Sequence, residues 1–269
     1  MTINETKNLN GAAQEGSFIA VDGNKNIINP SHAIFPIIKH DRNGFICLIG
    51  TGFFIAENGL FLTAKHVLMD VLDDNGNQTH AISLVQFLEG SYVIRPILKC
   101  SSHEVADISV GISAPMASSN GKTLKNKLIK LTSNIGEVGK GVFTYAYPKT
   151  VIKHSAKQTL HFNVDYYKGF IQKDYPNGRD KILLPGACFQ TSMYIHGGAS
   201  GGPVFNDEGV VCGVNSTGYE NEPLSFITPI NTIVNLVLND VGTPNNSTGQ
   251  ISIQELINDK FILYDDKKF

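Results

Sequence analysis

Charged residues are scarce in this chain, and long apolar runs are missing. Charged side chains make up 17% of the 269 residues and the formal net charge is −2, against about 25% charged residues in a typical globular domain. A chain without a basic excess has no overall positive field to attract nucleic acid or an anionic membrane. No stretch reaches the roughly 18 consecutive apolar residues of a membrane-spanning helix. We therefore expect neither nucleic acid nor a membrane among the partners of this protein.

Cysteines are few as well, and the start of the chain lacks a leader signal. Cys47, Cys100, Cys188 and Cys212 lie far apart, mostly inside apolar runs, which favours buried free thiols over disulfides. Residues 1–16 show no basic segment followed by an apolar one, the pattern of a secretory signal. These features predict a cytoplasmic protein. Because the cysteine and histidine spacings match no zinc pattern, we expect no metal and no cofactor.

What the chain does contain is a long series of short apolar segments separated by turn residues. Short strands at this spacing are typical of an all-β sandwich or barrel. The segments of a first series are 33–39, 45–55, 60–63, 82–88, 92–98 and 107–112. After a linker at 113–127, a second series comprises 128–131, 141–146, 160–164, 169–172, 182–184, 188–191, 204–205, 210–215 and 224–228.

The regions outside these two series have a different pattern. Residues 1–30 are polar and aperiodic, which predicts an N-terminal extension. Residues 229–239 begin with Pro229 and carry apolar side chains at helical spacing, so they predict a terminal helix. Residues 241–269 form a polar C-terminal tail with a possible helix at 251–257. A short helical turn is expected at 64–71.

One serine lies in a glycine-rich bend that leads directly into an apolar run. The segment reads Gly197-Gly198-Ala199-Ser200-Gly201-Gly202-Pro203-Val204-Phe205. A hydroxyl that attacks a carbonyl needs such a bend, because its oxygen must be exposed and nearby amide groups must converge on one oxyanion. Glycine permits the positive φ values that this requires. Upstream of Ser200 lie His66 and Asp107, so the three side chains of a possible catalytic triad follow in the order His, Asp, Ser.

Each of these features also has a plainer interpretation. The bend could be an ordinary turn, His66 a surface histidine and Asp107 the cap of a strand. The bend also fits the G-x-S-x-G elbow of α/β-hydrolases, but that fold needs a histidine after the serine, and no histidine follows Ser200. Residues 120–123 end like a phosphate-binding loop, but the first glycine which that motif requires is Met116 here. The order and the flanking residues favour the triad.

The three local sequences resemble those of the trypsin-like (chymotrypsin-fold) serine peptidases, and within them the bacterial branch that includes the HtrA proteases. The segment before the histidine, Gly50-Thr51-Gly52-Phe53-Phe54-Ile55, is similar to a strand of this family. Two segments after the serine, 209–216 and 225–231, are also similar to strands of this family. The similarity runs from about residue 31 to 240, and we expect no PDZ-like module after it.

This resemblance implies an all-β fold of two six-stranded antiparallel β-barrels with a C-terminal helix. The peptidase domain would span 31–240, with barrel one at about 31–115, barrel two at about 128–228 and the terminal helix at about 229–239.

The resemblance also implies a role for each residue of the site. Ser200 would be the nucleophile, His66 the general base and Asp107 the group that orients the imidazole, while the backbone N–H groups of Gly198 and Ser200 would bind the oxyanion. By the same resemblance, Tyr194 would lie at the base of the specificity pocket. The walls would come from Ile195, Val214, Asn215, Ser216 and Ser225. Because this set offers no carboxylate, we expect a small or medium apolar residue on the acyl side of the cleaved bond.

The chain also departs from its relatives, and the departures bear on control. Ala199 stands where zymogen-activated members carry an aspartate, and no Ile-Val-Gly-Gly-like activation site lies near the start. Activation by an inserted N-terminus is therefore not expected. The sequence predicts a serine endopeptidase of narrow or regulated specificity, which acts on a peptide or protein substrate and is controlled by a protein activator or regulator. The alternative is a catalytically gated or inactive protease-fold module that binds a peptide or protein partner.

Overall fold

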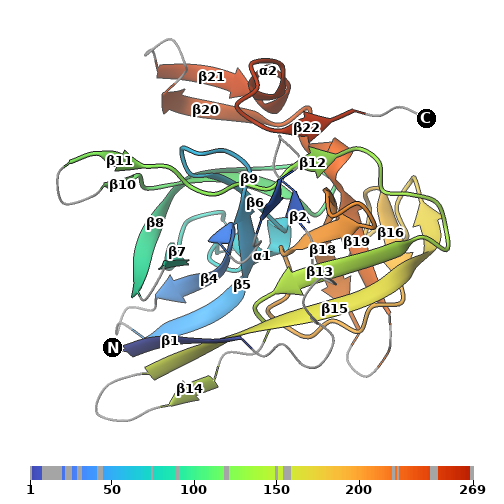
Figure 1. The fold of residues 1–269 in the computed structure, drawn as a ribbon, viewed down its shortest axis with the longest axis horizontal. Helices are drawn as coiled ribbons and strands as arrows, with labels where there is room; N and C mark the ends of the chain where they lie inside the picture. The colour runs from blue at the N-terminus through green and yellow to red at the C-terminus, as the bar shows by residue number, and fades with distance from the viewer. Residues whose placement is uncertain are drawn as a thin grey trace.

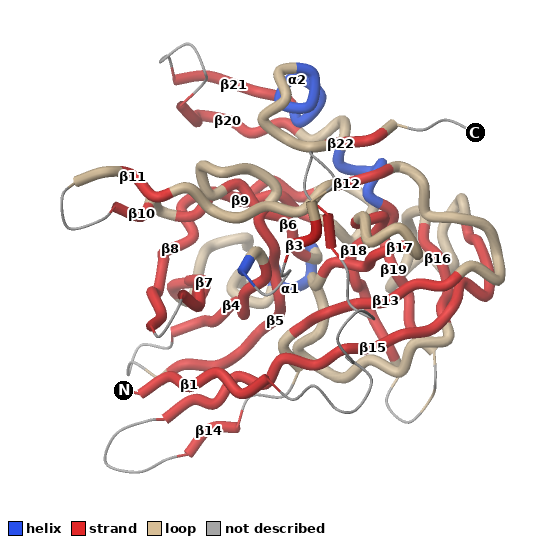
Figure 2. The backbone as a smooth tube through the Cα atoms, viewed as in Figure 1, coloured by secondary structure: helices blue, strands red, loops and turns tan. Residues whose placement is uncertain are grey.

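The chain folds into two β-barrels that lie side by side, with a layer of C-terminal elements above them (Figure 1). Strands predominate over helices (Figure 2). This arrangement is that of a computed structural model, which describes residues 2–7, 20–21, 26–28, 32–40, 45–73, 75–88, 91–117, 121–148, 151–153, 159–219, 222, 224–242 and 248–266.

The first barrel is a closed ring of six antiparallel strands. Its order around the ring is β4 (Ile34–His40), β5 (Ile46–Phe54), β6 (Leu60–Thr63), β9 (Ser109–Ser113), β8 (Ser91–Ser102) and β7 (Ala81–Leu88). Phe35, Phe54 and Phe61 fill its interior, with the Phe35 ring 4.5 Å from Phe54 and 5.6 Å from Phe61. Rings of this size remove large apolar areas from water, which explains why the apolar segments of the first series close on one another.

The second barrel is also a ring of six antiparallel strands. Its order is β17 (Pro203–Asn206), β13 (Gly141–Ala146), β15 (Thr159–Tyr175), β16 (Cys188–Thr191), β19 (Ser225–Pro229) and β18 (Val211–Gly218). Pairing between β17 and β18 closes the ring. The two barrels confirm the predicted fold class.

Further strands flank the second barrel. The strand β12 (Leu131–Thr132) pairs in parallel with β18 and with β22 (Tyr264–Asp265). The first part of β15 pairs with β14 (Val151–Lys153) and, in parallel, with β1 (Thr2–Lys7). Between the barrels, the linker carries the small hairpin of β10 (Met116–Ala117) and β11 (Thr123–Leu124). Of the predicted N-terminal extension, only β1, β2 (Ala20–Val21), β3 (Ile27–Ile28) and residue 26 fall within the described residues.

Two strand predictions for the second barrel were wrong. The predicted strands 160–164 and 169–172 are parts of the single long strand β15. Residues 182–184 are not a strand, because one carboxylate oxygen of Asp180 accepts hydrogen bonds from the backbone N–H groups of Ile182, Leu183 and Leu184. Amide groups occupied in this way cannot take part in a strand ladder.

The prediction of one terminal helix at 229–239 was also wrong. A single 3₁₀ turn, η2 (Ile230–Ile233), is followed by the strand β20 (Val237–Gly242), which pairs with β21 (Thr248–Ser252). A short helix, α2 (Ile253–Asn258), then begins with a capping box between Ser252 and Glu255, a motif that satisfies two free amide groups. The helix predicted at 64–71 is present as α1 (Lys65–Met69).

The C-terminal elements belong to the main core of the protein. The side chains of Leu238, Ile251, Ile253, Leu256 and Ile262 are buried in the same hydrophobic cluster as the interior of the first barrel. Residues 241–269 are therefore not a loose tail over the part that the structure describes.

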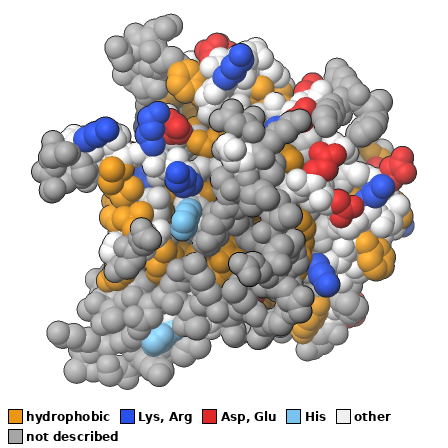
Figure 3. All heavy atoms as spheres, in the orientation of Figure 1, with side chains coloured by type: hydrophobic (Ala, Val, Ile, Leu, Met, Phe, Trp, Pro, Cys, Tyr) orange, Lys and Arg blue, Asp and Glu red, His pale blue; other side chains and the backbone are white. Residues whose placement is uncertain are grey.

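The surface and the cysteines complete the comparison with the predictions. On the face in Figure 3, acidic and basic side chains are mixed over the described surface. Among the described helices, none is both long and apolar enough to cross a membrane.

All four cysteines are free, as predicted. Cys188 and Cys212 are buried, but Cys47 and Cys100 are exposed. The prediction of burial was therefore wrong for Cys47 and Cys100.

Candidate active site

The first barrel carries His66 and Asp107 and brings them into contact. His66 lies in α1, directly after β6, and Asp107 lies in the turn between β8 and β9. The His66 Nδ1 atom is 2.8 Å from Asp107 Oδ2, and the His66 backbone N–H donates to Asp107 Oδ1 at 3.0 Å. The two bonds fix both the ring and the backbone of His66 against a single carboxylate.

The carboxyl group of Asp107 is charged in this setting. Burial by itself would raise its pKa, but the hydrogen bond and the attraction of His66, together with a hydrogen bond from Ser216, hold the pKa of Asp107 below its ordinary value. An ionised carboxylate only accepts hydrogen bonds, so His66 Nδ1 must donate. The proton of the neutral ring then lies on Nδ1, and Nε2 is left as the basic atom. The side chain of His66 is 49% exposed, whereas that of Asp107 is only 14% exposed.

Ser200 is the second residue of the second of two successive tight turns in the second barrel. The first turn is closed by a hydrogen bond from Ala199 N–H to the His196 carbonyl, and the second by one from Gly202 N–H to the Ala199 carbonyl. The third residue of each turn has a positive φ, +94° at Gly198 and +85° at Gly201. Residues with a Cβ atom rarely adopt a positive φ, so glycine is favoured at both positions. The predicted glycine-rich bend is thus a double turn that presents Ser200 at its corner.

Thr51, from β5 of the first barrel, joins this double turn to the barrel that carries His66. Its backbone N–H donates to the Ser200 carbonyl at 2.8 Å, and its hydroxyl donates to the Gly198 carbonyl at 2.9 Å. The same hydroxyl accepts the backbone N–H of Tyr147 at 3.0 Å. The segment Gly50–Ile55, which the sequence marked only by resemblance, therefore has a physical task at the interface of the barrels.

The double turn also leaves amide groups available beside Ser200. The N–H groups of Ala199, Gly201 and Gly202 bond to carbonyls within the protein. For the N–H groups of Gly198 and Ser200, the described residues supply no acceptor. These are the two donors that the sequence predicted for an oxyanion, and they flank the hydroxyl that would create it.

The Ser200 hydroxyl is connected to Asp107 through Ser216. Ser200 Oγ donates to the Ser216 carbonyl at 3.1 Å, and the Ser216 hydroxyl donates to Asp107 Oδ2 in a short hydrogen bond. A hydroxyl has one proton, so that of Ser200 points to Ser216 and not to His66. The structure thus brings all three predicted residues to one place, with the Ser200 hydroxyl bonded to Ser216 instead of His66. The contact between Ser216 and Asp107 was not predicted from the sequence, which marked Ser216 only as a pocket wall.

The residues predicted for the specificity pocket differ in their exposure. Tyr194 is exposed, and Ile195 is buried against Gly218, where an added Cβ atom would lie 2.8 Å from Ile195 Cγ1. The side chains of Val214, Asn215 and Ser225 are fully buried. That these residues form walls of the specificity pocket stays a prediction.

Two of these buried residues support the fold of the site. The Asn215 carbonyl accepts the N–H of Gly201, and its side-chain amide donates to the hydroxyl of Thr144. The Ser225 hydroxyl lies 2.7 Å from that of Thr191. The neighbours of a buried hydroxyl or amide depend on strand register, which the sequence alone did not reveal.

His196, at the start of the first turn, has a partner in the second barrel. Its Nδ1 atom lies 3.0 Å from the hydroxyl of Tyr167, whose oxygen lies 3.4 Å from Asp165 Oδ2. Burial and the nearby Asp165 raise the pKa of Tyr167, so this phenol is neutral and helps to hold the double turn.

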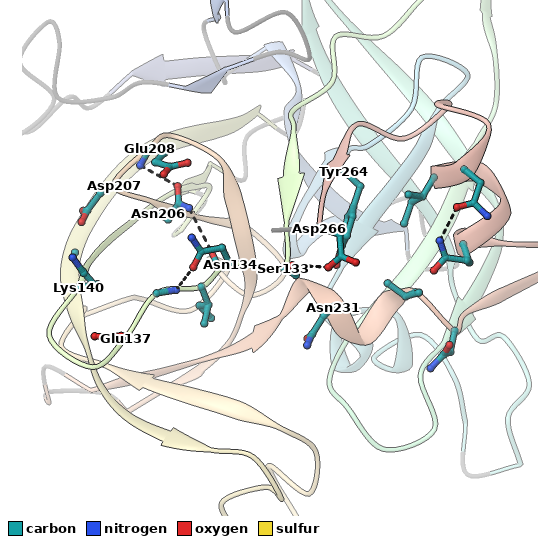
Figure 4. Close-up of a pocket in the computed structure, with 18 residues that line it drawn as sticks. Ser133, Asn134, Glu137, Lys140, Asn206, Asp207, Glu208, Asn231, Tyr264 and Asp266 are labelled. Carbon is teal, nitrogen blue, oxygen red and sulfur yellow. Dashed lines mark hydrogen bonds between the residues drawn. The ribbon is translucent and has the colours of Figure 1, made fainter. Parts of the chain in front are cut away.

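A separate hollow of about 1130 Å³ lies between the second barrel and the C-terminal elements. Figure 4 shows its polar lining, in which Ser133 donates to Asp266 and the side chain of Asn206 donates to the carbonyl of Asn134. None of His66, Asp107 and Ser200 lines this hollow. The candidate active site is therefore defined by the contacts among His66, Asp107 and Ser200, and not by this hollow.

Within the described residues, no group of three or more histidine, cysteine or acidic side chains could hold a metal ion.

Comparisons with known proteins agree with this geometry. A family model described as a trypsin-like peptidase domain matches residues 50–214, more than half of the chain. No curated protein shows significant similarity to the chain. Among solved structures, the crystal structure of Deg5 matches with a TM-score of 0.52 and 21% identity, over 76% of this chain and 86% of that chain. At this identity the match concerns the fold, and it agrees with the two barrels.

Proposed function

Because this chain belongs to the trypsin-like peptidase family, we propose that it is a serine endopeptidase with His66, Asp107 and Ser200 as its catalytic triad. The observation that carries the proposal is the ionised Asp107 carboxylate, which holds His66 Nδ1 at 2.8 Å and leaves Nε2 as a base. A histidine fixed in this tautomer is what a serine hydroxyl needs in order to become a nucleophile.

The reaction begins when Ser200 Oγ attacks the carbonyl carbon of the substrate while His66 Nε2 takes the hydroxyl proton. The carbonyl oxygen becomes an oxyanion, which accepts hydrogen bonds from the N–H groups of Gly198 and Ser200. The imidazolium is stabilised by Asp107 and then gives its proton to the leaving amine, so that the C–N bond breaks and an acyl-enzyme remains. Water then repeats these steps at the ester, which releases the acid and restores Ser200.

The position of the Ser200 hydroxyl favours a gated enzyme as a second candidate. The hydroxyl donates to the Ser216 carbonyl, so its proton must turn towards His66 before the attack. Rotation about one side-chain bond between staggered positions is enough for such a change. A substrate backbone or a protein activator that competes for the Ser216 carbonyl would release the hydroxyl. We propose that control of the enzyme acts at this step.

We also propose the substrate preference and the location that the sequence predicts. The buried Ile195 beside Gly218 leaves little depth between these residues, which supports a small or medium apolar residue on the acyl side of the cleaved bond. The N-terminal sequences of the fragments cut from an unfolded protein would test this preference. Free thiols at all four cysteines support a reducing compartment such as the cytoplasm.

The test of the proposed function is cleavage of an unfolded, fluorescently labelled protein by the wild type and by Ser200→Ala. We expect the substitution to lower kcat at least 10⁴-fold, because the nucleophile is lost. Ser133→Ala, which removes a remote serine hydroxyl of the same barrel, is the matched control and should keep full activity. If Ser200→Ala retains activity within tenfold of the wild type, Ser200 is not the nucleophile.

A further inference from the structure

The turn that carries Asp107 is built around the imidazole of His103. His103 Nδ1 accepts the backbone N–H of Val105 at 3.1 Å and that of Ala106 at 2.8 Å. The His103 N–H donates to the Ile108 carbonyl at 3.0 Å and closes the hairpin between β8 and β9. A ring nitrogen that accepts a hydrogen bond carries no proton. His103 is therefore a neutral imidazole with its proton on Nε2.

Residues from both barrels pack against this turn. A shift of the backbone near His103 would therefore also move Asp107. From the first barrel, Lys65 Nζ donates to the carbonyls of His103 and Glu104 at 2.9 and 2.8 Å. From the second barrel, Gly186 packs so closely that an added Cβ would lie 2.7 Å from the Cα of Ala106. Ala106 is 2% exposed and its peptide leads directly into Asp107. Its amide group therefore cannot shift without moving the carboxylate.

We propose that His103 is a positioning residue for Asp107 and that protonation of His103 releases this turn and lowers activity. The inference rests on the proposed function and deepens it. An imidazolium carries a proton on both ring nitrogens. The Nδ1–H of protonated His103 would then face the N–H groups of Val105 and Ala106, and neither hydrogen bond could form. The two amide groups would thus lose their acceptor, so the state of the turn can be tested by changing the pH.

The charged and titratable groups around the turn come from two elements. Lys65 and His66 come from α1, Glu104 and Asp107 come from the turn, and the hydroxyl of Ser216 reaches Asp107 from β18. Asp107 is already bonded to His66 and Ser216. Its carboxylate is therefore not available to His103.

The experiment compares kcat/KM against pH for the wild type, His103→Asn and His103→Ala. The asparagine carbonyl can accept N–H groups two and three residues ahead, as in an Asx turn, but it does not titrate and adds no charge. At pH 8 we expect His103→Asn to stay within about threefold of the wild type. We expect His103→Ala to fall roughly tenfold or more, since both hydrogen bonds are lost.

The acid side of the profile separates a positioning role from a merely structural one. Protonation of His66 alone gives a slope of 1 in log kcat/KM against pH. Because His103 must also be neutral, the wild type should exceed this slope, whereas His103→Asn should show a slope of 1 and keep more activity at low pH. His80→Asn, which replaces a histidine of another turn, is the matched control and should keep the wild-type profile.

Hydrogen exchange at the Ala106 amide gives a second readout that does not depend on activity. In the wild type, protection of this amide should fall as the pH drops from 8 to 5.5, once the chemical exchange rate has been corrected for pH, and in His103→Asn it should persist. Identical acid limbs and unchanged Ala106 protection in the two proteins would overturn the inference. If no protein cleaves substrate but Ala106 protection behaves as expected, the proposed function fails while the role of His103 in the turn stands.

Discussion

The two barrels hold their shares of the active site in different ways. The first barrel holds His66 and Asp107 already bonded, with the carboxylate accepting from the ring, from the His66 backbone and from Ser216. The second barrel holds Ser200 on a double turn, with its hydroxyl bonded to a carbonyl instead of its base. In the proposed triad, the acid–base half is therefore preassembled, and the nucleophile half would need a small rotation of the Ser200 hydroxyl. The proposed control thus acts at the second barrel.

The largest effect should come from breaking the preassembled half with Asp107→Asn. An amide cannot stabilise the imidazolium and favours the wrong tautomer of His66, so kcat should fall about 10⁴-fold. The melting temperature should fall as well, because three hydrogen bonds to a charged group are weakened or lost. Steady-state kinetics with a peptide substrate would measure this fall. Asp73→Asn, in a surface turn of the same barrel, should stay within about twofold. A loss of only about tenfold at Asp107 would mean that this contact is not the catalytic one.

A second large effect should come from the double turn, through Gly201→Ala. Its new Cβ would lie 2.1 Å from Thr63 Oγ1 and 2.2 Å from the Thr51 carbonyl, at a φ of +85°. We expect a loss of about 3 kcal/mol in unfolding free energy and a fall in kcat of about 10²-fold as Ser200 is displaced.

Gly139→Ala separates the clash from the backbone strain. Gly139 also has a positive φ, +94°, but an added Cβ would meet nothing within 4 Å. This variant should lose only about 1 kcal/mol in urea unfolding and keep its activity. Equal losses at the two glycines would mean that contact between the barrels does not hold the double turn in place.

A smaller effect should come from Ser216→Ala, which removes the link between the two halves. Loss of a hydrogen bond to a charged group should cost about 1.5 kcal/mol at pH 7 and lower kcat about tenfold. The Ser216 bond helps to hold the pKa of Asp107 below its ordinary value, so its stabilisation is present above about pH 4. That stabilisation is lost as the pH falls through the lowered pKa.

Urea unfolding at pH 7 and pH 3 would therefore show a gap between wild type and Ser216→Ala that narrows in acid. A gap of the same size at both values would contradict the assignment of this hydrogen bond to the ionised carboxylate.

The smallest effect on activity should come from chemical labelling of the cysteines. The two barrels differ in how exposed their cysteines are. Cys47 and Cys100 of the first barrel are exposed, but Cys188 and Cys212 of the second are buried. Burial raises the pKa of Cys212 to about 12, and the thiolate is the reactive form. With a maleimide at pH 7.5, Cys47 should react first and without loss of activity, and Cys212 should react only on unfolding. Fast labelling of Cys212 in the native protein would show that the second barrel opens.

The sequence predicted the parts of this molecule that local patterns determine. The apolar segments marked most strands of both barrels, and the glycines around Ser200 predicted the bend, because positive φ is a local requirement. The resemblance, and not the spacing, suggested that His66 and Asp107 would meet. Their contact in the structure depends on the closure of the first barrel, which pairs strands that lie far apart in the sequence.

The predictions that were wrong concern residues whose partners lie far away in the chain. Val237 and Leu238 fitted a helical stripe, but their backbone pairs with β21, and nothing in their own sequence reveals that strand. Ile182 and Leu183 had strand-like composition, yet Asp180 occupies their amide groups. The role of His103 was equally hidden, because an imidazole as a turn acceptor has no sequence signature.

The most direct test of the triad is to map the site of reaction with a fluorophosphonate by mass spectrometry. The account predicts a single phosphonyl adduct on Ser200 in the wild type and a loss of labelling in His66→Ala, since the hydroxyl reacts only when that imidazole takes its proton. An adduct on another residue, or equal labelling of Ser200 in both proteins, would contradict it.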